Sequence, residues 1–176
     1  MESMLPNGAT IECSNLSSPI EVQRLLGAGG QGEVYEVTFA GEALAAKWYF
    51  PKIASKDIGL AERLRDSIRF SSPSPAFLWP ISLLEPSISS CTSLNIPSGS
   101  FGYLMAIRPP GYVGAIEHSA ARISVTLQSV VRACFYLAEA FDALHSKGLC
   151  YKDISLGNLF LKPGTGEILI CDNDNV

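Results

Sequence analysis

Four short segments of the chain carry residues whose types and spacing suit phosphate chemistry, and the first of them is rich in glycine. The segment Gly27-Ala-Gly-Gly-Gln-Gly32 fits the pattern G-x-G-x-x-G, in which a backbone without Cβ atoms approaches a phosphate closely. A flexible hairpin without a ligand explains this pattern equally well. Strand-like residues 33–37 follow directly, which excludes a dinucleotide-binding fingerprint, because that motif opens a helix. No Gly-Lys-Ser/Thr follows either, so a Walker A loop is excluded.

The second signal is a single lysine in an apolar strand. Lys47 is the only charged residue of the segment 44–50 and lies fifteen residues after Gly32. An ammonium group in a buried strand is costly unless an anion meets it. Taken by itself, this position favours an ammonium that extends to solvent. Beneath a glycine hairpin, a phosphate partner becomes the better interpretation.

The remaining two signals are oxygen-bearing side chains near the C-terminus. Asp153 and Asn158 stand five residues apart in a polar loop, and Asp172 directly follows an apolar strand. A carboxylate can accept a proton from an attacking hydroxyl, and carboxylate and amide oxygens suit Mg²⁺. Ordinary turns use the same residue types, so each signal alone is also compatible with a purely structural role.

Two halves of different periodicity must position these residues. In the first half, β-branched and aromatic runs separated by turns predict strands over 20–26, 33–39, 43–49, 77–84 and 101–107. Between them, one amphipathic helix is predicted over 56–70. In the second half, an apolar stripe at helical spacing predicts a long helix over 124–146, and a hairpin is predicted over 159–161 and 167–171. Residues 1–19, rich in Ser and Asn, are expected to form a flexible leader.

Composition restricts the classes of partner. The chain has 176 residues and a net charge of −4 without a cluster of Lys and Arg, so no nucleic acid is expected to bind. The N-terminus has no continuous apolar run, and the charge-free stretch 87–107 is interrupted by Ser, Pro and Gly. Neither a secretory signal nor a membrane span is therefore expected. The five cysteines lack C-x-x-C spacing, which favours free thiols and a cytoplasmic location, with Cys134 and Cys171 buried.

The order of these segments resembles that of the eukaryotic-type protein-kinase superfamily over residues 20–176. The matching features are the glycine hairpin, the strand lysine, the long helix, the Asp153–Asn158 loop and the strand-end Asp172. The resemblance implies an α+β, protein-kinase-like fold. Residues 20–108 would form an antiparallel five-stranded N-lobe with one helix. Residues 109–176 would form only the start of the helical C-lobe, with the long helix, the catalytic loop and a metal-binding hairpin.

The resemblance also implies a role for each matching residue. Asp153 would be the catalytic base with Lys152 beside it, and Asn158 and Asp172 would bind Mg²⁺. Lys47 would hold the α- and β-phosphates of ATP, and these groups would converge on one triphosphate cleft between the lobes. The other positions implied to bind the nucleotide are Gly27, Gly29, Gly30, Gly32, Val34, Ala45, Met105, Ala106 and Ile107.

A helix glutamate is also expected to pair with Lys47, and Glu62 lies at a fitting distance along the chain. At 100° per residue, however, Glu62 falls opposite the apolar stripe of its helix. A solvent-facing Glu62, with another partner for Lys47, therefore stays open as the alternative.

The reaction implied is transfer of the γ-phosphoryl group of ATP to a protein hydroxyl, with Ser or Thr as the acceptor. The sequence departs from the family at three places. Tyr151 replaces the His of His-Arg-Asp, and Ser155 replaces the Lys that is typical of Ser/Thr kinases two residues after the base. The third departure is Asp172-Asn-Asp174 in place of Asp-Phe-Gly.

The chain stops at Val176, so the resemblance implies an N-terminal fragment of a kinase. Part of the apolar stripe of the helix 124–146 would then be uncovered, with self-association as one expected consequence. The alternative hypothesis is a truncated, non-catalytic pseudokinase that acts as a nucleotide-binding or protein-interaction module.

Overall fold

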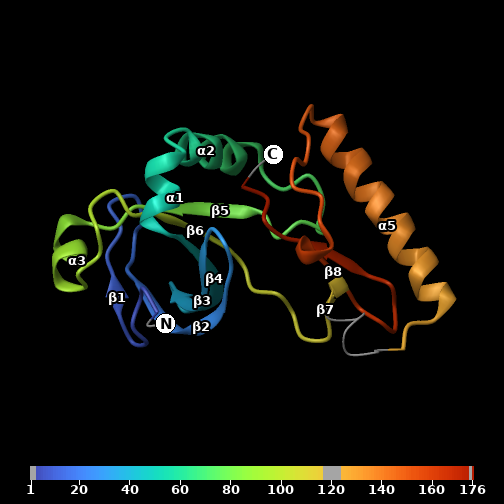
Figure 1. The fold of residues 1–176 in the computed structure, drawn as a ribbon, viewed down its shortest axis with the longest axis horizontal. Helices are drawn as coiled ribbons and strands as arrows, with labels where there is room; N and C mark the ends of the chain where they lie inside the picture. The colour runs from blue at the N-terminus through green and yellow to red at the C-terminus, as the bar shows by residue number, and fades with distance from the viewer. Residues whose placement is uncertain (1–2, 117–123, 175) are drawn as a thin grey trace. The chain divides into compact units, whose positions relative to one another are not determined.

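The computed structural model describes residues 3–116, 124–174 and 176, and the chain divides into two compact units (Figure 1). The first unit comprises the residues up to Ile68 together with Pro80–Ile107. The second comprises Arg69–Trp79 and Arg108–Val176. The change of sequence periodicity near residue 108 therefore coincides with a unit boundary. The segment Arg69–Trp79, in contrast, belongs with the second unit, although it lies in the strand-rich half of the sequence.

The first unit is built on a six-stranded antiparallel sheet with the order β1-β2-β3-β4-β6-β5. The strands are β1 (Thr10–Ile11), β2 (Ile20–Ala28), β3 (Gly32–Phe39), β4 (Glu42–Tyr49), β5 (Pro80–Leu84) and β6 (Gly102–Ala106). The last five confirm the five predicted strands, although β5 begins three residues later than predicted. Gly41 has a φ of 86° in the turn between β3 and β4, a conformation that glycine adopts without a Cβ penalty.

The N-terminal segment differs from the flexible leader expected for residues 1–19. Leu5 and Ile11 are fully buried in the core of the first unit, and β1 pairs with β2. The Leu5 backbone N–H donates to the Tyr35 hydroxyl at 2.9 Å, and the Asn15 side-chain amide donates to the Leu83 carbonyl at 2.7 Å. The partners lie far along the chain, so local composition gives no sign of them.

The helices of the first unit are α1 (Pro51–Lys56), most of α2 (Leu60–Phe70) and α3 (Ile88–Ser93). One helix was predicted over 56–70, and the structure ends α1 at Lys56 and begins α2 at Leu60. Asp57 lies in this break and pairs with Arg63 at 2.5 Å. The hydrogen bond from that guanidinium lowers the pKa of the Asp57 carboxyl. α3 lies where no helix is predicted, and it begins where the Ser87 hydroxyl accepts the Ser90 N–H.

The second unit packs a long helix against a small sheet (Figure 1). The sheet has the order β7-β8-β9, formed by β7 (Val113–Gly114), β8 (Leu159–Leu161) and β9 (Ile168–Ile170). The helix is α5 (Leu127–Ser146), and a short 3-10 turn, η1 (Leu156–Asn158), precedes β8. The predicted hairpin and the predicted long helix are both confirmed. Gly148 ends the helix with a φ of 73°.

Much of the predicted apolar stripe of α5 is uncovered among the described residues. Leu144 is buried, whereas Leu127, Val130 and Val131 are 78%, 45% and 60% exposed. The expectation of exposed apolar surface on this helix is therefore confirmed. The expectation of a buried Cys134 is wrong, because Cys134 lies on the exposed part of the helix. Within the described residues, no helix combines the length and the apolar character needed to cross a membrane.

Alkaline pH is expected to destabilise the first unit through Cys13. All five cysteines are free thiols, and burial raises the pKa of Cys13 from 9.0 to about 11. Between these pH values the unfolded chain loses the thiol proton while the folded chain keeps it. The contribution of the Cys13 thiol to the free energy of unfolding is therefore fully present below pH 9 and is lost as the pH rises towards 11. This contribution is at most about 3 kcal/mol.

Urea unfolding at a series of pH values from 8 to 11 tests this expectation. Cys13→Ala should flatten the loss of stability in this window, and Cys134→Ala, at an exposed thiol, should leave it unchanged. Identical pH profiles for the wild type and Cys13→Ala would contradict the assignment.

Candidate functional site

The glycine segment forms the turn between β2 and β3. Gly27 pairs with Val34 across the two strands, and the Gly29 N–H donates to the Gly32 carbonyl at 2.9 Å. A Cβ on Gly27, Gly29 or Gly30 would meet no atom within 4 Å. The hairpin thus presents open backbone on three of its four glycines, which is the property required for close approach to a phosphate. Gly32 differs from the other three glycines, because it packs so closely against the backbone of β4 that no Cβ fits there.

Lys47 lies on β4 and is 4% exposed. Its ammonium donates to the Gln31 side-chain carbonyl at 2.9 Å and lies 5.2 Å from the centroid of the Tyr49 ring. The Phe50 N–H in turn donates to the Gln31 backbone carbonyl at 2.9 Å. These contacts join the tip of the glycine hairpin to the buried lysine. The sequence did not identify Gln31 as a contact of this lysine, and its pattern contains no signal that would have done so.

The sheet register places four of the predicted nucleotide-binding residues, Val34, Ala45, Lys47 and Met105, on one face. Val34 pairs with Lys47, and Ala45, two residues before Lys47, pairs with Met105. Cross-strand partners, and residues two apart on a strand, project from the same face of a sheet. The opposite face carries the core residues Tyr35, Val37, Ala46 and Trp48. At the end of β6, Ala106 is exposed and Ile107 is half-buried.

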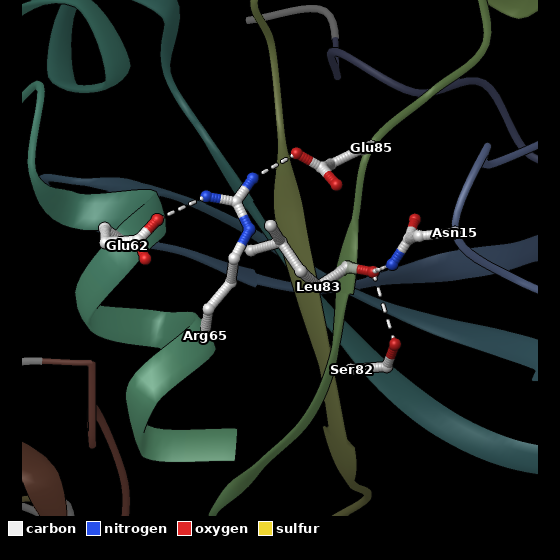
Figure 2. A network of polar contacts seen from close by, with 6 residues as sticks. All are labelled: Asn15, Glu62, Arg65, Ser82, Leu83 and Glu85. Atoms are coloured by element: carbon white, nitrogen blue, oxygen red, sulfur yellow. Dashed lines mark hydrogen bonds and ion pairs between the residues drawn. The ribbon is translucent and has the colours of Figure 1, made fainter. Parts of the chain in front are cut away.

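The structure does not form the expected pair between Lys47 and Glu62. The Glu62 side chain is 63% exposed, and its carboxylate pairs with Arg65 at 2.9 Å (Figure 2). Arg65 also binds Glu85 at 2.5 Å, so one guanidinium bridges α2 and the end of β5. The reason is helical geometry: Leu60 and Leu64 fix the buried face of α2, and Glu62 lies on the other side.

In the second unit, the loop after α5 brings Asp153 and Asn158 together. The Asn158 side-chain amide donates to the backbone carbonyl and to the carboxylate of Asp153, at 3.0 and 3.1 Å. Asp153 and Lys152 are exposed, and Asn158 is half-buried. Because its NH₂ group contacts Asp153, the Asn158 side-chain oxygen is the atom that can ligate a cation.

The same loop is tied to the residue before Asp172. The Tyr151 hydroxyl donates to the Cys171 carbonyl at 2.6 Å, and the Cys171 N–H donates to the Asn158 carbonyl at 2.9 Å. Burial raises the pKa of Tyr151, and the nearby Asp172 and Asp153 carboxylates act in the same direction. Cys171, expected to be buried, is only half-buried. The second unit therefore gathers the predicted base Asp153 and the two predicted Mg²⁺ ligands, Asn158 and Asp172, into one cluster around Tyr151.

The oxygens of this cluster suit a hard cation only if a bound phosphate compound supplies further oxygen ligands. Among the described residues, no group of three or more His, Cys, Asp or Glu side chains can hold a metal ion. Asn158 and Asp172 supply an amide and a carboxylate oxygen, and Mg²⁺ commonly binds through one or two protein oxygens, substrate phosphates and water. The donor set thus suits Mg²⁺ that arrives with a phosphate compound.

Comparison of the sequence with protein-family models and with curated proteins gives no match. The structure is nevertheless similar to solved structures of kinase domains. A point mutant of the Mycobacterium tuberculosis PknI kinase domain matches with a TM-score of 0.70 and 24% identity, covering 98% of this chain. Two further structures of that kinase domain each match with a TM-score of 0.69, at 24% and 23% identity and over 98% of this chain.

This chain spans 64%, 63% and 62% of the length of those three solved chains. At this level of identity the similarity concerns the fold. The chain has the fold of a protein kinase domain over the part that it covers, and the predicted α+β, kinase-like fold class is confirmed.

Proposed function

We propose that the chain binds Mg·ATP and belongs to a protein kinase that transfers the γ-phosphoryl group to a Ser or Thr hydroxyl of a protein. The observation that carries this proposal is the shared face of the first sheet. Lys47 is buried there beside Val34, Ala45 and Met105, and it contacts the tip of an open glycine hairpin. This combination suits a nucleotide whose base packs on small apolar residues and whose phosphates meet an ammonium group.

The second unit would supply the chemistry of transfer. The Asp153 carboxylate is exposed and is oriented by the Asn158 amide, as a base for an incoming hydroxyl requires. Asn158 and Asp172 would hold the Mg²⁺ that accompanies the nucleotide, and this ion would neutralise charge on the phosphates. Lys152, exposed beside the base, would contribute positive charge near the transferred group. The free thiols support the proposal of a cytoplasmic location.

Calorimetric titration with Mg·ATP tests the binding part of the proposal. The wild type is expected to bind, and Lys47→Met is expected to weaken binding at least tenfold, because the phosphates lose a charge-assisted contact. Lys52→Met is the matched control, since Lys52 is an exposed lysine on α1. The proposal fails if the wild type binds no nucleotide, or if Lys47→Met binds as tightly as the control.

The second candidate is a non-catalytic module that binds nucleotide or protein. It is favoured by the exposed apolar side chains of α5 and by the departures at Tyr151, Ser155 and Asn173. Self-association through α5 would be one form of this function. Incorporation of labelled γ-phosphate, compared between wild type and Asp153→Asn, separates the two candidates. A binding module takes up no label in either protein.

A further inference from the structure

Asn173 is a polar side chain with no solvent exposure at the end of the β8–β9 hairpin. Its NH₂ group donates two hydrogen bonds, to the Leu78 carbonyl at 2.9 Å and to the Ile170 carbonyl at 3.0 Å. The position corresponds to Phe in the Asp-Phe-Gly motif of the family that the sequence resembles. Both N–H donors of this buried carboxamide are satisfied, whereas its side-chain oxygen is buried without a hydrogen-bond partner among the described residues. A carboxamide with an unsatisfied acceptor is costly to bury, so its two donated bonds must offset part of that cost.

These two hydrogen bonds add to the backbone hydrogen bonds that join segment 76–78 to β9 inside the second unit. Segment 76–78 runs beside β9, where the Ile170 N–H donates to the Ala76 carbonyl at 2.7 Å and the Leu78 N–H donates to the Ile170 carbonyl at 2.9 Å. Asn173 adds a bond to the Ile170 carbonyl and occupies the Leu78 carbonyl. The Asn173 side chain therefore links the residues after β9 to segment 76–78, which also forms hydrogen bonds with β9.

Both residues next to Asp172 in the chain are restrained by hydrogen bonds. On one side, Cys171 is bound through both its N–H and its carbonyl, to Asn158 and to the Tyr151 hydroxyl. On the other side, Asn173 is held by its carboxamide. Asp172 itself has a φ of 56°, in the left-handed region, which costs free energy for a residue with a Cβ, although Asp adopts it more readily than most residues. An unfavourable conformation of this kind persists only where the surroundings over-determine it.

We propose that Asn173 is a positioning residue whose two amide hydrogen bonds keep Asp172 in the left-handed conformation that directs its carboxylate to nucleotide-bound Mg²⁺. The reference to Mg²⁺ rests on the proposed function, whereas the effect on the backbone does not. The donor character of the side chain is essential, since an apolar side chain of similar size would leave two buried carbonyls without these bonds.

Asn173→Leu tests the proposal, because it keeps the branching of the side chain at Cγ and removes both donors. Hydrogen exchange measured by mass spectrometry should be about tenfold faster in a peptide covering 168–174, whereas peptides from α5 should be unchanged. Asn15→Leu is the matched control. It also removes a carboxamide bond to a backbone carbonyl, that of Leu83 (Figure 2), but it lies in the first unit.

The second readout is the Mg²⁺ dependence of ATP binding, taken as the ratio of affinities with Mg²⁺ and with EDTA. Asn173→Leu should lower this ratio at least fivefold while affinity in EDTA stays unchanged, and Asn15→Leu should leave both unchanged. A variant with wild-type exchange, or with faster exchange but an unaltered ratio, overturns the proposal.

General unfolding of the second unit would also overturn the positioning role, because Asn173 would then support the whole unit. Asn173→Ala, which adds no bulk, decides this point if Asn173→Leu does not fold. If the wild type binds no Mg·ATP, the proposed function fails, and the exchange measurement alone decides whether Asn173 fixes Asp172.

Discussion

Gly166→Ala is expected to lower the free energy of unfolding by about 4 kcal/mol, the combined cost of left-handed backbone and of overpacking. Gly166 has a φ of 78° in the turn between β8 and β9. A Cβ there would lie 2.8 Å from the Arg132 Cβ and 3.2 Å from the Ala133 backbone nitrogen, and closer still to the Ser129 carbonyl oxygen. Most of these atoms belong to the backbone of α5, which cannot move aside without disturbing the helix.

Gly164→Ala is the control within the same turn. A Cβ at Gly164 meets no atom within 4 Å, so this change is expected to alter stability by less than about 0.5 kcal/mol. Urea unfolding followed by far-UV circular dichroism measures both variants. Similar stabilities for the two variants would show that the turn does not pack on α5 as described.

Gly32→Ala is expected to cost about 3 kcal/mol, at the upper end of the range for overpacking. Gly32 opens β3 and pairs with Tyr49 of β4. An added Cβ would lie 2.9 Å from the Trp48 carbonyl carbon and 3.0 Å from the Tyr49 Cα, and within contact of the Trp48 carbonyl oxygen. Because all three atoms are backbone, β3 and β4 must separate to admit a methyl group.

Gly30→Ala, two residues earlier in the same hairpin, provides the comparison. Its Cβ would meet no atom within 4 Å, and we expect its stability to stay within about 0.5 kcal/mol of the wild type. The tryptophan fluorescence of Trp48, which lies in the adjacent core, is a suitable probe of unfolding. A Gly30→Ala variant as unstable as Gly32→Ala would refute the distinct functions assigned to the two glycines.

The candidate site shows which predictions a local pattern can support. The glycine hairpin and Lys47 were identifiable because each stands out from its neighbours in the sequence. Their shared sheet face follows from strand alternation and an antiparallel register. The predicted pairing of Glu62 with Lys47, in contrast, conflicts with helical geometry, because Glu62 lies on the side of α2 opposite the buried leucines. The structure agrees with the predicted strands that carry the glycine hairpin and Lys47.

Other features required contacts between residues far apart in the chain. Nothing near Asn173 in the sequence indicates that its amide binds the Leu78 carbonyl, 95 residues away. The burial of Leu5 depends likewise on Tyr35, and the exposure of Cys134 depends on which part of α5 the hairpin covers. Each of these outcomes is set by a partner that periodicity alone cannot name.

The sequence by itself therefore determined the strand-rich and helix-rich halves, the glycine hairpin with its lysine, and the oxygen-bearing residues of the second half. These follow from periodicity and residue chemistry, which act over a few neighbouring positions. Only the tertiary structure decided the N-terminal packing, the break between α1 and α2, the pairing of Glu62 with Arg65 and the fastening of Asp172 by its neighbours. The physical reason is that a buried polar group takes whichever partner the folded chain brings within hydrogen-bond distance, regardless of separation in sequence.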